Sequence, residues 1–375
     1  MAKAERARSD AMGRRMAMAV LGRQGRSTER DTTGATAQRG YVFDDLFDER
    51  YDEQLLDASN GFAPWTRFVP PWVRLADAVQ RRRDEYDVIV TWSERLSLAL
   101  MTLQRLAAHG KPHVAMLYWF SRPSVQVPLR AFGDSLHAIV TWSSVQRNYA
   151  IERLGIPHEK LYLVKHFVDQ LFWAPNQNES ETDMICAAGA EMRDYPTLLA
   201  ALRDLDVQCH IAADHVRIDR FGFARRVSTE AFSSMAGQNV TIGRKRAIEL
   251  RKLYARSRFV VVPLEASDTD NGITVILEAM AMGKPVICSR TRGQVDVIRE
   301  GETGLFVPVG DAKAMRAAIV DLWNDPARAA SMGRAARAYV EKYHTIEKFS
   351  HDVKRAVDAS LEGRAAAYDG SFATQ

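Results

Sequence analysis

Two carboxylates lie close together in the segment ASDTDNGITVILEAMAMGKPVICS, residues 266–289. Asp270 falls in the turn SDTDNG, and Glu278 comes eight residues later on the helix that ITVILEAMAMG predicts. Carboxylates accept hydrogen bonds from sugar hydroxyls, often two at once. This spacing places both acids near the mouth of one turn, where they suit a ligand with hydroxyls on both sides of a diphosphate. A surface or capping role for each acid remains an alternative.

The same helix opens with three backbone N–H groups, those of Gly272, Ile273 and Thr274. The positive end of a helix dipole favours an anion such as a diphosphate. Glycine at 272 lets a phosphate approach without a side chain in the way. A plain helix cap by Asp270 or Asn271 would produce the same pattern, so the alternative stays open.

The elements that would position these groups form two series in which short apolar strands alternate with helices. In the first half, strands at 16–22 (MAMAVLG), 86–92, 111–120 and 137–143 are accompanied by helices at 96–110 and 145–155. In the second half, strands at 184–188, 207–213, 258–264, 284–289 and 304–309 alternate with helices at 197–205, 248–257, 273–283 and 312–325. Such alternation predicts an α/β fold with two doubly wound halves, whose ligand lies at the strand ends.

Composition excludes several classes of protein. The 375 residues are 46% hydrophobic and 26% charged, as in ordinary globular domains, and no run is long enough for a membrane span. Basic residues are in excess within residues 1–30 and the rest is near neutral, so we expect no nucleic-acid-binding body.

Three well-separated cysteines, Cys186, Cys209 and Cys288, predict buried reduced thiols. Residues 23–40 are polar and predict a loop.

Several longer runs carry a resemblance to a known family. The run NGITVILEAMAMGKPVI and the run GQVDVIREGETGLFVPVGD (293–311) resemble the donor-binding half of the retaining GT-B glycosyltransferases, the family-4-like group 1. Residues 155–175 are similar to the interdomain connector of that group, and residues 325–349 to its closing helices. The resemblance covers about residues 137–355 and is much looser over residues 14–136, where acceptor contacts would lie.

The resemblance implies a GT-B fold of two Rossmann-like, doubly wound domains that face a central cleft. The expected organisation is a basic leader at 1–13, an acceptor-binding domain at 14–175, a donor-binding domain at 176–350, and a C-terminal helix and tail at 351–375 that could pack back on the first domain.

The resemblance also implies roles for the acidic pair. In this family an acid-x7-acid pair flanks the donor, so Glu278 matches the acid that binds the nucleotide ribose and Asp270 the acid that faces the transferred sugar. The backbone of Gly272, Ile273 and Thr274 would hold the distal phosphate. The first acid is usually Glu, so Asp270 departs from the pattern by one methylene.

Basic residues are implied at two further places. Arg193 falls where the family has a Lys that meets the diphosphate, whereas Ala190 replaces the usual Arg. A guanidinium can fork onto phosphate oxygens and stabilise the leaving nucleotide. The alternative for Arg193 is a surface side chain paired with Asp194. Arg244 and Lys245 fall in the family's nucleobase loop, where they could contact the base or be solvated.

Asp268, Thr269 and Asp270 form a D-x-D tripeptide, which binds a divalent metal in other glycosyltransferases. We expect no metal and no further cofactor, because the helix dipole and Arg193 supply positive charge.

The predicted function is a hexosyltransferase that moves a sugar from a nucleotide-diphosphate sugar to an unidentified acceptor hydroxyl, with retention of configuration. The acceptor class stays open among polysaccharides, lipid-linked molecules and small molecules. The rival is a catalytically impaired nucleotide-sugar-binding protein of the same fold. We expect a cytoplasmic location, and the basic N-terminus leaves open a peripheral contact with the inner membrane face.

Overall fold

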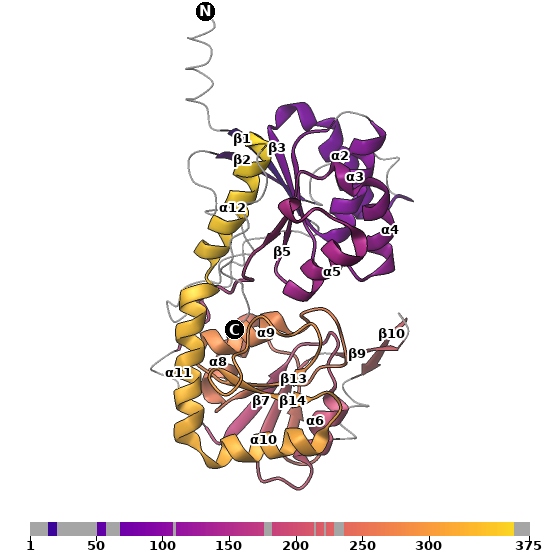
Figure 1. The fold of residues 1–375 in the computed structure, drawn as a ribbon. Coiled ribbons are helices and arrows are strands. Elements are labelled where there is room, and N and C mark those ends of the chain that lie inside the picture. Colours follow the sequence, from indigo (N-terminus) through magenta and orange to yellow (C-terminus); the bar gives the residue numbers. More distant parts are fainter. Residues whose placement is uncertain are drawn as a thin grey trace, which may run out of the picture. The chain divides into compact units, whose positions relative to one another are not determined.

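A computed structural model describes residues 14–20, 51–57, 68–107, 110–175, 182–213, 215–220, 223–228 and 236–363. The chain divides into two compact units (Figure 1). The N-terminal unit contains the described residues up to Lys165 and those from Glu347 onward, and the C-terminal unit runs from His166 to Ile346. The predicted leader at 1–13, the loop at 23–40 and the tail beyond 363 lie outside the described residues.

The N-terminal unit is built on a six-stranded sheet in the order β2-β1-β3-β4-β5-β6, with every neighbouring pair parallel. Its strands are β1 Arg14–Val20, β2 Tyr51–Leu56, β3 Val88–Trp92, β4 His113–Met116, β5 Ala138–Thr141 and β6 Leu161–Leu163. Its helices are α2 Pro71–Arg81, α3 Glu94–Leu106, α4 Pro123–Phe132, α5 Ser144–Leu154 and α12 Ile346–Glu362. In Figure 1, α2 to α5 lie on one face of this sheet and α12 runs along the other.

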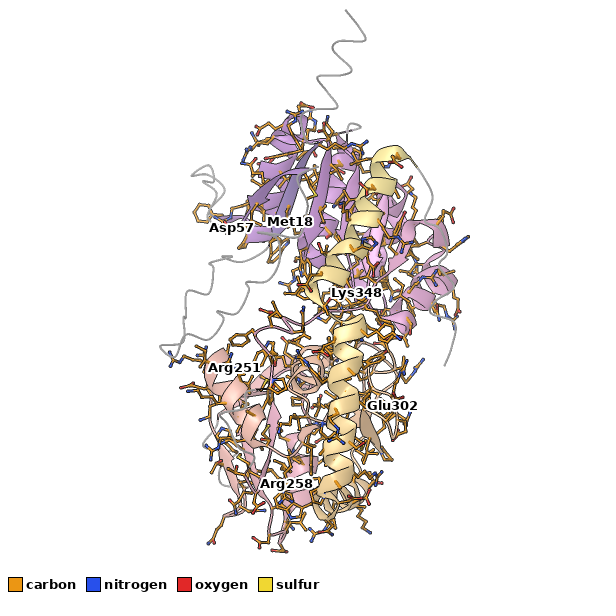
Figure 2. The ribbon with its side chains drawn as sticks, turned by 90° about the vertical axis from the view of Figure 1, so that its left-hand side faces the viewer. Met18, Asp57, Arg251, Arg258, Glu302 and Lys348 are labelled. Atoms are coloured by element: carbon orange, nitrogen blue, oxygen red, sulfur yellow. The ribbon has the colours of Figure 1, made fainter. Side chains whose placement is uncertain are left out.

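The first strand, β1, is apolar because it lies between β2 and β3 inside the sheet. Met16 to Val20 are all buried on β1, and Figure 2 shows Met18 within the sheet. Strands of a parallel sheet are covered on both faces and therefore read as continuous apolar runs. A strand is confirmed where MAMAVLG predicted one, but it begins two residues earlier, at Arg14, and Leu21 and Gly22 lie outside the described residues.

The C-terminal unit has a second six-stranded parallel sheet in the order β11-β8-β7-β12-β13-β14. Its strands are β7 Met184–Ala188, β8 Gln208–Ala212, β11 Val240–Ile242, β12 Val260–Val262, β13 Val286–Arg290 and β14 Gly304–Pro308. Its helices are α6 Tyr195–Leu202, α8 Ala247–Arg256, α9 Ile273–Ala281, α10 Ala312–Asn324 and α11 Pro326–Tyr343. A separate antiparallel pair, β9 His215–Arg220 and β10 Phe223–Ser228, was not predicted.

This architecture confirms the α/β class with two doubly wound halves. Parallel neighbours require crossover helices, and in Figure 1 α6 and α10 lie on one face of the second sheet while α8 and α9 cover the other. The predicted buried thiols are confirmed: Cys186, Cys209 and Cys288 are all free and buried. Among the described residues, no helix has the length and apolar content needed to cross a membrane.

The carboxyl end of α9 is clamped by α11. Nη1 of Arg337 donates to the carbonyls of Ala281 and Trp173, at 2.6 and 2.8 Å. Gly333 of α11 packs directly on Gly283, because a methyl group on Gly333 would lie 2.0 Å from the Gly283 carbonyl oxygen. The position of α9 therefore depends on a helix more than forty residues further along the chain.

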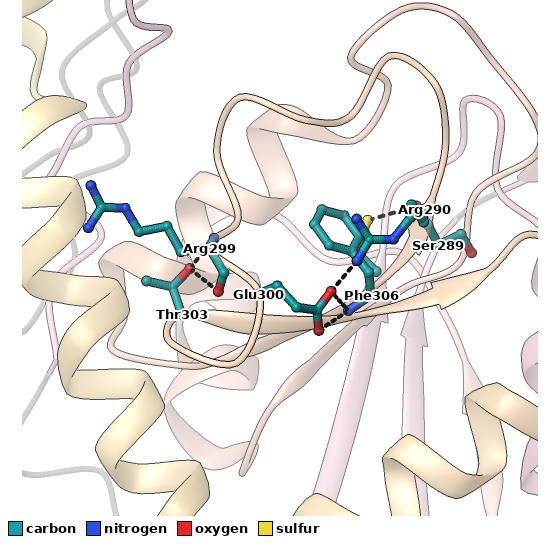
Figure 3. A network of polar contacts seen from close by, with 7 residues as sticks. Ser289, Arg290, Arg299, Glu300, Thr303 and Phe306 are labelled. Carbon is teal, nitrogen blue, oxygen red and sulfur yellow. Dashed lines mark hydrogen bonds and ion pairs between the residues drawn. The ribbon is translucent and has the colours of Figure 1, made fainter. Parts of the chain in front are cut away.

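The exit from β13 is held to β14 by a surface network (Figure 3). The Arg290 guanidinium pairs with the Glu300 carboxylate and lies 4.3 Å from the centre of the Phe306 ring. The Glu300 carboxylate also accepts the Phe306 N–H at 3.2 Å. The backbone N–H of Arg299 donates to Thr303 Oγ1 at 2.9 Å and closes the turn between these residues. The network anchors both ends of the connection that carries residues 291–298.

Gly333→Ala tests the helix clamp. Alanine favours a helix by about 1 kcal/mol over glycine, but the added methyl would meet the Gly283 carbonyl, and overpacking costs about 1–3 kcal/mol. We expect a lower melting temperature by differential scanning calorimetry, whereas Ser331→Ala on the exposed face of the same helix should change it little. A Gly333→Ala variant as stable as the parent would show that α9 and α11 separate without cost.

Candidate active site

The site residues predicted in the second half gather at the carboxyl edge of the C-terminal sheet. The chain runs outward from β7 to β8 and β11 on one side, and from β12 to β13 and β14 on the other. The strand order therefore reverses between β7 and β12, which is where open α/β sheets bind ligands. Residues 189–194 follow β7 and residues 263–272 follow β12, so both segments lie at this switch point.

The segment after β7 has a strained and well-anchored backbone. Gly189 and Met192 both have positive φ angles, 92° and 52°. The Glu265 N–H donates to the Met192 carbonyl at 3.0 Å, and the Asp194 N–H donates to the Pro263 carbonyl at 3.1 Å. A non-glycine residue in the left-handed region costs free energy and persists only where its surroundings enforce it. These bonds tie the segment to the strand exit next to it.

Arg193 is the buried cation of this segment. Its side chain is 4% exposed, with Nε donating to the Ala188 carbonyl at 3.0 Å and Nη1 to the Glu191 carbonyl at 2.7 Å. A methyl group on Gly189 would lie 2.6 Å from Nη2, so glycine leaves room for the guanidinium. The alternative of a surface arginine paired with Asp194 is wrong, because Arg193 is buried and Asp194 instead caps α6.

The guanidinium of Arg193 lies beside the start of α9. A methyl group on Gly272 would be 3.6 Å from Arg193 Nη1. The two hydrogen bonds of Arg193 go to neutral carbonyls, so they do not neutralise its charge. The amino end of a helix is also positive. Two sources of positive potential therefore meet at the switch point, an arrangement suited to an anion.

Gly272 occupies the N-cap position of α9 and no side chain caps the helix, so the predicted alternative of capping by Asp270 or Asn271 is wrong. Asn271 Nδ2 donates instead to Ser267 Oγ at 2.9 Å. One of the three amides expected to be free is not: the Ile273 N–H donates to the Asp270 carbonyl at 3.2 Å, because the chain turns tightly before the helix. Within the described residues, the Gly272 and Thr274 amides have no backbone acceptor.

Asp270 is buried at the base of the same turn. Its side chain is 5% exposed, and Oδ1 accepts a hydrogen bond from Thr269 Oγ1 at 3.1 Å. The carboxylate is therefore oriented by the residue before it rather than extended into solvent.

Glu278 is buried inside the helix layer and is 9% exposed. Tyr254 of α8, itself buried, donates its hydroxyl to Glu278 Oε2 at 3.1 Å. Burial raises the pKa of Glu278 to about 8, while the Tyr254 hydrogen bond and the charge of Arg193 oppose that shift. Pairing of a raised-pKa acid with a nearby cation is common at functional sites. Tyr254 was not among the predicted site residues, since nothing in its local sequence distinguishes it from a core tyrosine.

Arg244 and Lys245 lie at the carboxyl end of β11, two strands away from β7. Arg244 is exposed and Lys245 is partly exposed. Burial lowers the pKa of His210 on β8, and the charge of Lys245 lowers it further, which places Lys245 near that strand. Both residues thus lie at the carboxyl edge of the sheet, apart from Arg193 and the amino end of α9.

The D-x-D tripeptide shows no metal cluster. In the part of the chain that the structure describes, no three His, Cys, Asp or Glu side chains gather in a way that could hold a metal ion. Asp268 is partly exposed, whereas Asp270 is buried and bonded to Thr269.

Comparison with known proteins identifies the same half of the chain. Residues 192–325 match the family described as "Glycosyl transferases group 1". The chain is 25% identical over 214 residues to the D-inositol 3-phosphate glycosyltransferase of an Arthrobacter species, an alignment that covers 55% of this chain and 46% of that enzyme. The chain spans less than half the length of the curated relatives it matches.

Solved structures share the fold across nearly the whole chain. Sucrose-phosphate synthase from Thermosynechococcus elongatus superposes with a TM-score of 0.69 at 16% identity, covering 93% of this chain and all of that chain. HepE of Anabaena, crystallised with UDP-glucose, gives 0.64 at 15% identity and covers 92% and 99%. The two parallel sheets are therefore those of a GT-B fold.

The buried acid predicts a pH-dependent stability. The pKa of Glu278 is about 8 in the folded protein against 4.5 for a free side chain, so the folded state retains a proton that the unfolded state has lost between these values. Stability should fall as pH rises through this window, by up to about 1.4 kcal/mol per pH unit, and level off above pH 8.

Chemical unfolding at pH 5, 6, 7 and 8 measures this effect. Glu278→Gln should lose the dependence and gain stability relative to the parent as pH rises, whereas Glu302→Gln on the exposed surface should follow the parent. Parallel profiles for the parent and Glu278→Gln would show that Glu278 ionises normally.

Proposed function

We propose that this member of the glycosyl transferases group 1 family transfers a hexosyl group from a nucleotide-diphosphate sugar to an acceptor hydroxyl. The observation that carries the proposal is the buried guanidinium of Arg193 beside the amino end of α9, at the switch point of the C-terminal sheet. A diphosphate is the anionic part of every such donor, and this site offers it both charge and hydrogen-bond donors. The family match covers the segments that build the site.

The chemistry assigned to these groups is leaving-group stabilisation. The bond between the anomeric carbon and the donor diphosphate breaks, the acceptor oxygen bonds to that carbon, and the departing phosphate takes the acceptor proton. Arg193 and the amides of Gly272 and Thr274 would stabilise the negative charge that develops on the diphosphate. Attack on the face from which the diphosphate departs retains the anomeric configuration, and no side chain has to act as a nucleophile.

The two acids would bind hydroxyls at opposite ends of the donor. Glu278 is assigned to the ribose and Asp270 to the transferred sugar. Hydroxyls that donate to a carboxylate favour its ionised form. At pH 7 these hydroxyls would therefore favour release of the proton that burial holds on Glu278. Arg244 and Lys245, further along the sheet edge, are assigned to the nucleobase.

The acceptor would bind mainly in the N-terminal unit. There Glu94, which follows β3, holds the segment that follows β4. The Glu94 side chain is 7% exposed and accepts the backbone N–H groups of Trp119 and Tyr118 at 2.6 and 3.3 Å. Burial raises the pKa of the Glu94 carboxyl, which means that burying its charged form is unfavourable. The two hydrogen bonds from Trp119 and Tyr118 offset part of that cost. We assign the reaction to the cytoplasm and leave the chemical class of the acceptor open.

A donor screen tests the proposal directly. We expect one of the UDP-, GDP-, ADP- or dTDP-sugars to raise the melting temperature, with UDP-glucose the first to try because HepE was crystallised with it. Glu278→Ala should abolish that shift and Glu302→Ala should preserve it. If none of the four classes stabilises the protein, it is not a nucleotide-sugar enzyme; an unchanged shift in Glu278→Ala would remove Glu278 from the donor site.

Arg193→Ala separates catalysis from binding. Loss of a preorganised group that stabilises developing charge costs about 10²–10³-fold in kcat, so transfer or donor hydrolysis should fall by more than donor affinity. Arg193→Lys keeps the positive charge but cannot donate two parallel hydrogen bonds, so its kcat should lie between those of the parent and Arg193→Ala. Equal losses in kcat and affinity would argue against leaving-group stabilisation.

The rival function has one observation in its favour. Ala190 and Asp270 replace an Arg and a Glu that the family pattern normally has, which fits a protein that binds a nucleotide sugar without transferring it. Parent protein that binds a donor tightly, yet shows neither hydrolysis nor transfer, would support this rival.

A further inference from the structure

Gln294 lies in the connection between β13 and β14, at the same edge of the sheet as the site. Its side chain is 1% exposed. Nε2 donates to the carbonyl of Asp270 at 3.3 Å and to that of Asn271 at 3.1 Å. Its backbone N–H donates to Thr291 Oγ1 at 3.1 Å. One side-chain amide therefore holds two successive carbonyls of the turn that leads into α9.

The contact that brings Gln294 there tolerates no side chain at the preceding residue. A methyl group on Gly293 would lie 2.2 Å from the carbonyl oxygen of Thr269 and 2.4 Å from its nitrogen. The Gly293 N–H donates to the Ser267 carbonyl at 3.1 Å. Two backbone segments thus cross in direct contact, and this crossing fixes the position of Gln294 against the turn.

The bond to Asn271 determines which way the Gly272 N–H points. The Asn271 carbonyl and the Gly272 N–H belong to one planar trans peptide, in which they point in opposite directions. Holding the carbonyl against Gln294 directs the N–H away from Gln294. Gly272 has a φ of +88°, and glycine accepts either sign of φ at little cost. Without a restraint, this peptide could therefore reverse easily and turn its N–H away from a ligand.

The cost of burying Gln294 also indicates a role beyond packing. Its Oε1 is buried and has no hydrogen-bond partner among the described residues. A buried polar atom without a partner is unfavourable, so an apolar side chain would pack the two loops together at a lower cost in folding free energy. The turn contacts only the Nε2 group of the amide, which donates to the two carbonyls.

We propose that Gln294 is a positioning residue that holds the Asn271–Gly272 peptide with its N–H directed toward the diphosphate of the donor. This inference rests on the proposed function and adds to it a residue that contacts no substrate. The side chain acts through the peptide orientation, so its loss should weaken recognition of the diphosphate and leave recognition of the nucleoside unchanged.

The test uses isothermal titration of the full chain with UDP, GDP, ADP and dTDP, and with the four corresponding nucleosides. Gln294→Met keeps the length of the side chain and removes its donor. For the diphosphate that the parent binds, we expect Gln294→Met to weaken binding about tenfold or more, as for loss of a hydrogen bond to a charged group, and to change nucleoside affinity less than twofold. Val295→Ala, at the exposed neighbouring residue, should change neither affinity.

Two further variants keep the test decisive if Gln294→Met does not fold. Gln294→Glu would place an oxygen against the two carbonyls and should weaken diphosphate binding further. Thr291→Val removes the acceptor of the Gln294 N–H, keeps the side-chain amide and should give a smaller loss of the same selectivity. Equal changes in diphosphate and nucleoside affinity, or none in any variant, would overturn the inference; failure of the parent to bind any of the four diphosphates would overturn the proposed function itself.

Discussion

Positive potential is concentrated where β7 and β12 diverge, because the Arg193 guanidinium and the amino end of α9 lie side by side there. The hydrogen bonds that fix Arg193 go to neutral carbonyls, which orient the side chain and leave its charge intact. Burial of such a charge is unfavourable unless something compensates it. The positive φ of Met192 and the bonds between residues 192–194 and 263–265 hold this unfavourable arrangement in place. The surrounding fold thus stabilises a buried positive charge, which the proposed function assigns to the diphosphate of the donor.

The helix that supplies half of this potential is fixed at both ends by distant parts of the chain. Gln294 holds the carbonyls that precede α9, and Arg337 and Gly333 of α11 hold its last turn. The helix itself fixes the separation of Gly272 and Glu278 along its axis, and the contacts at both ends fix where that axis lies. The proposed donor would span both positions with its phosphate and its ribose, and it would meet groups that need no reorientation at the expense of binding free energy.

Local sequence was sufficient for the apolar strands of both sheets and for the position of the predicted site residues along the chain. Apolar runs such as MICAA became β7 residue for residue, and α9 begins one residue after Gly272 as its pattern predicts. The hairpin β9–β10 and the short strands β2 and β6 were missed because their runs are polar or only three residues long. The capping alternative was wrong because Asn271 bonds to Ser267, a choice that depends on the shape of the whole turn. Gln294 and Tyr254 were missed for a similar reason, since their roles arise from contacts between residues 23 or 24 apart in sequence.

Ala190 stands where the family pattern has an arginine, so one positive charge is absent. Burial of Arg193 compensates in part, because it strengthens the electrostatic effect of the charge that remains. The interaction between two charges grows as the effective dielectric falls, so a guanidinium that is 4% exposed acts on a nearby phosphate more strongly than one in solvent. The charge also reaches Glu278, whose pKa it lowers against the larger effect of burial. An anion at the switch point would repel the Glu278 carboxylate and so offset part of the attraction from Arg193. If the donor binds as proposed, phosphate binding and ionisation of Glu278 oppose each other, and the sugar hydroxyls that bind Glu278 would have to outweigh that repulsion for the acid to ionise.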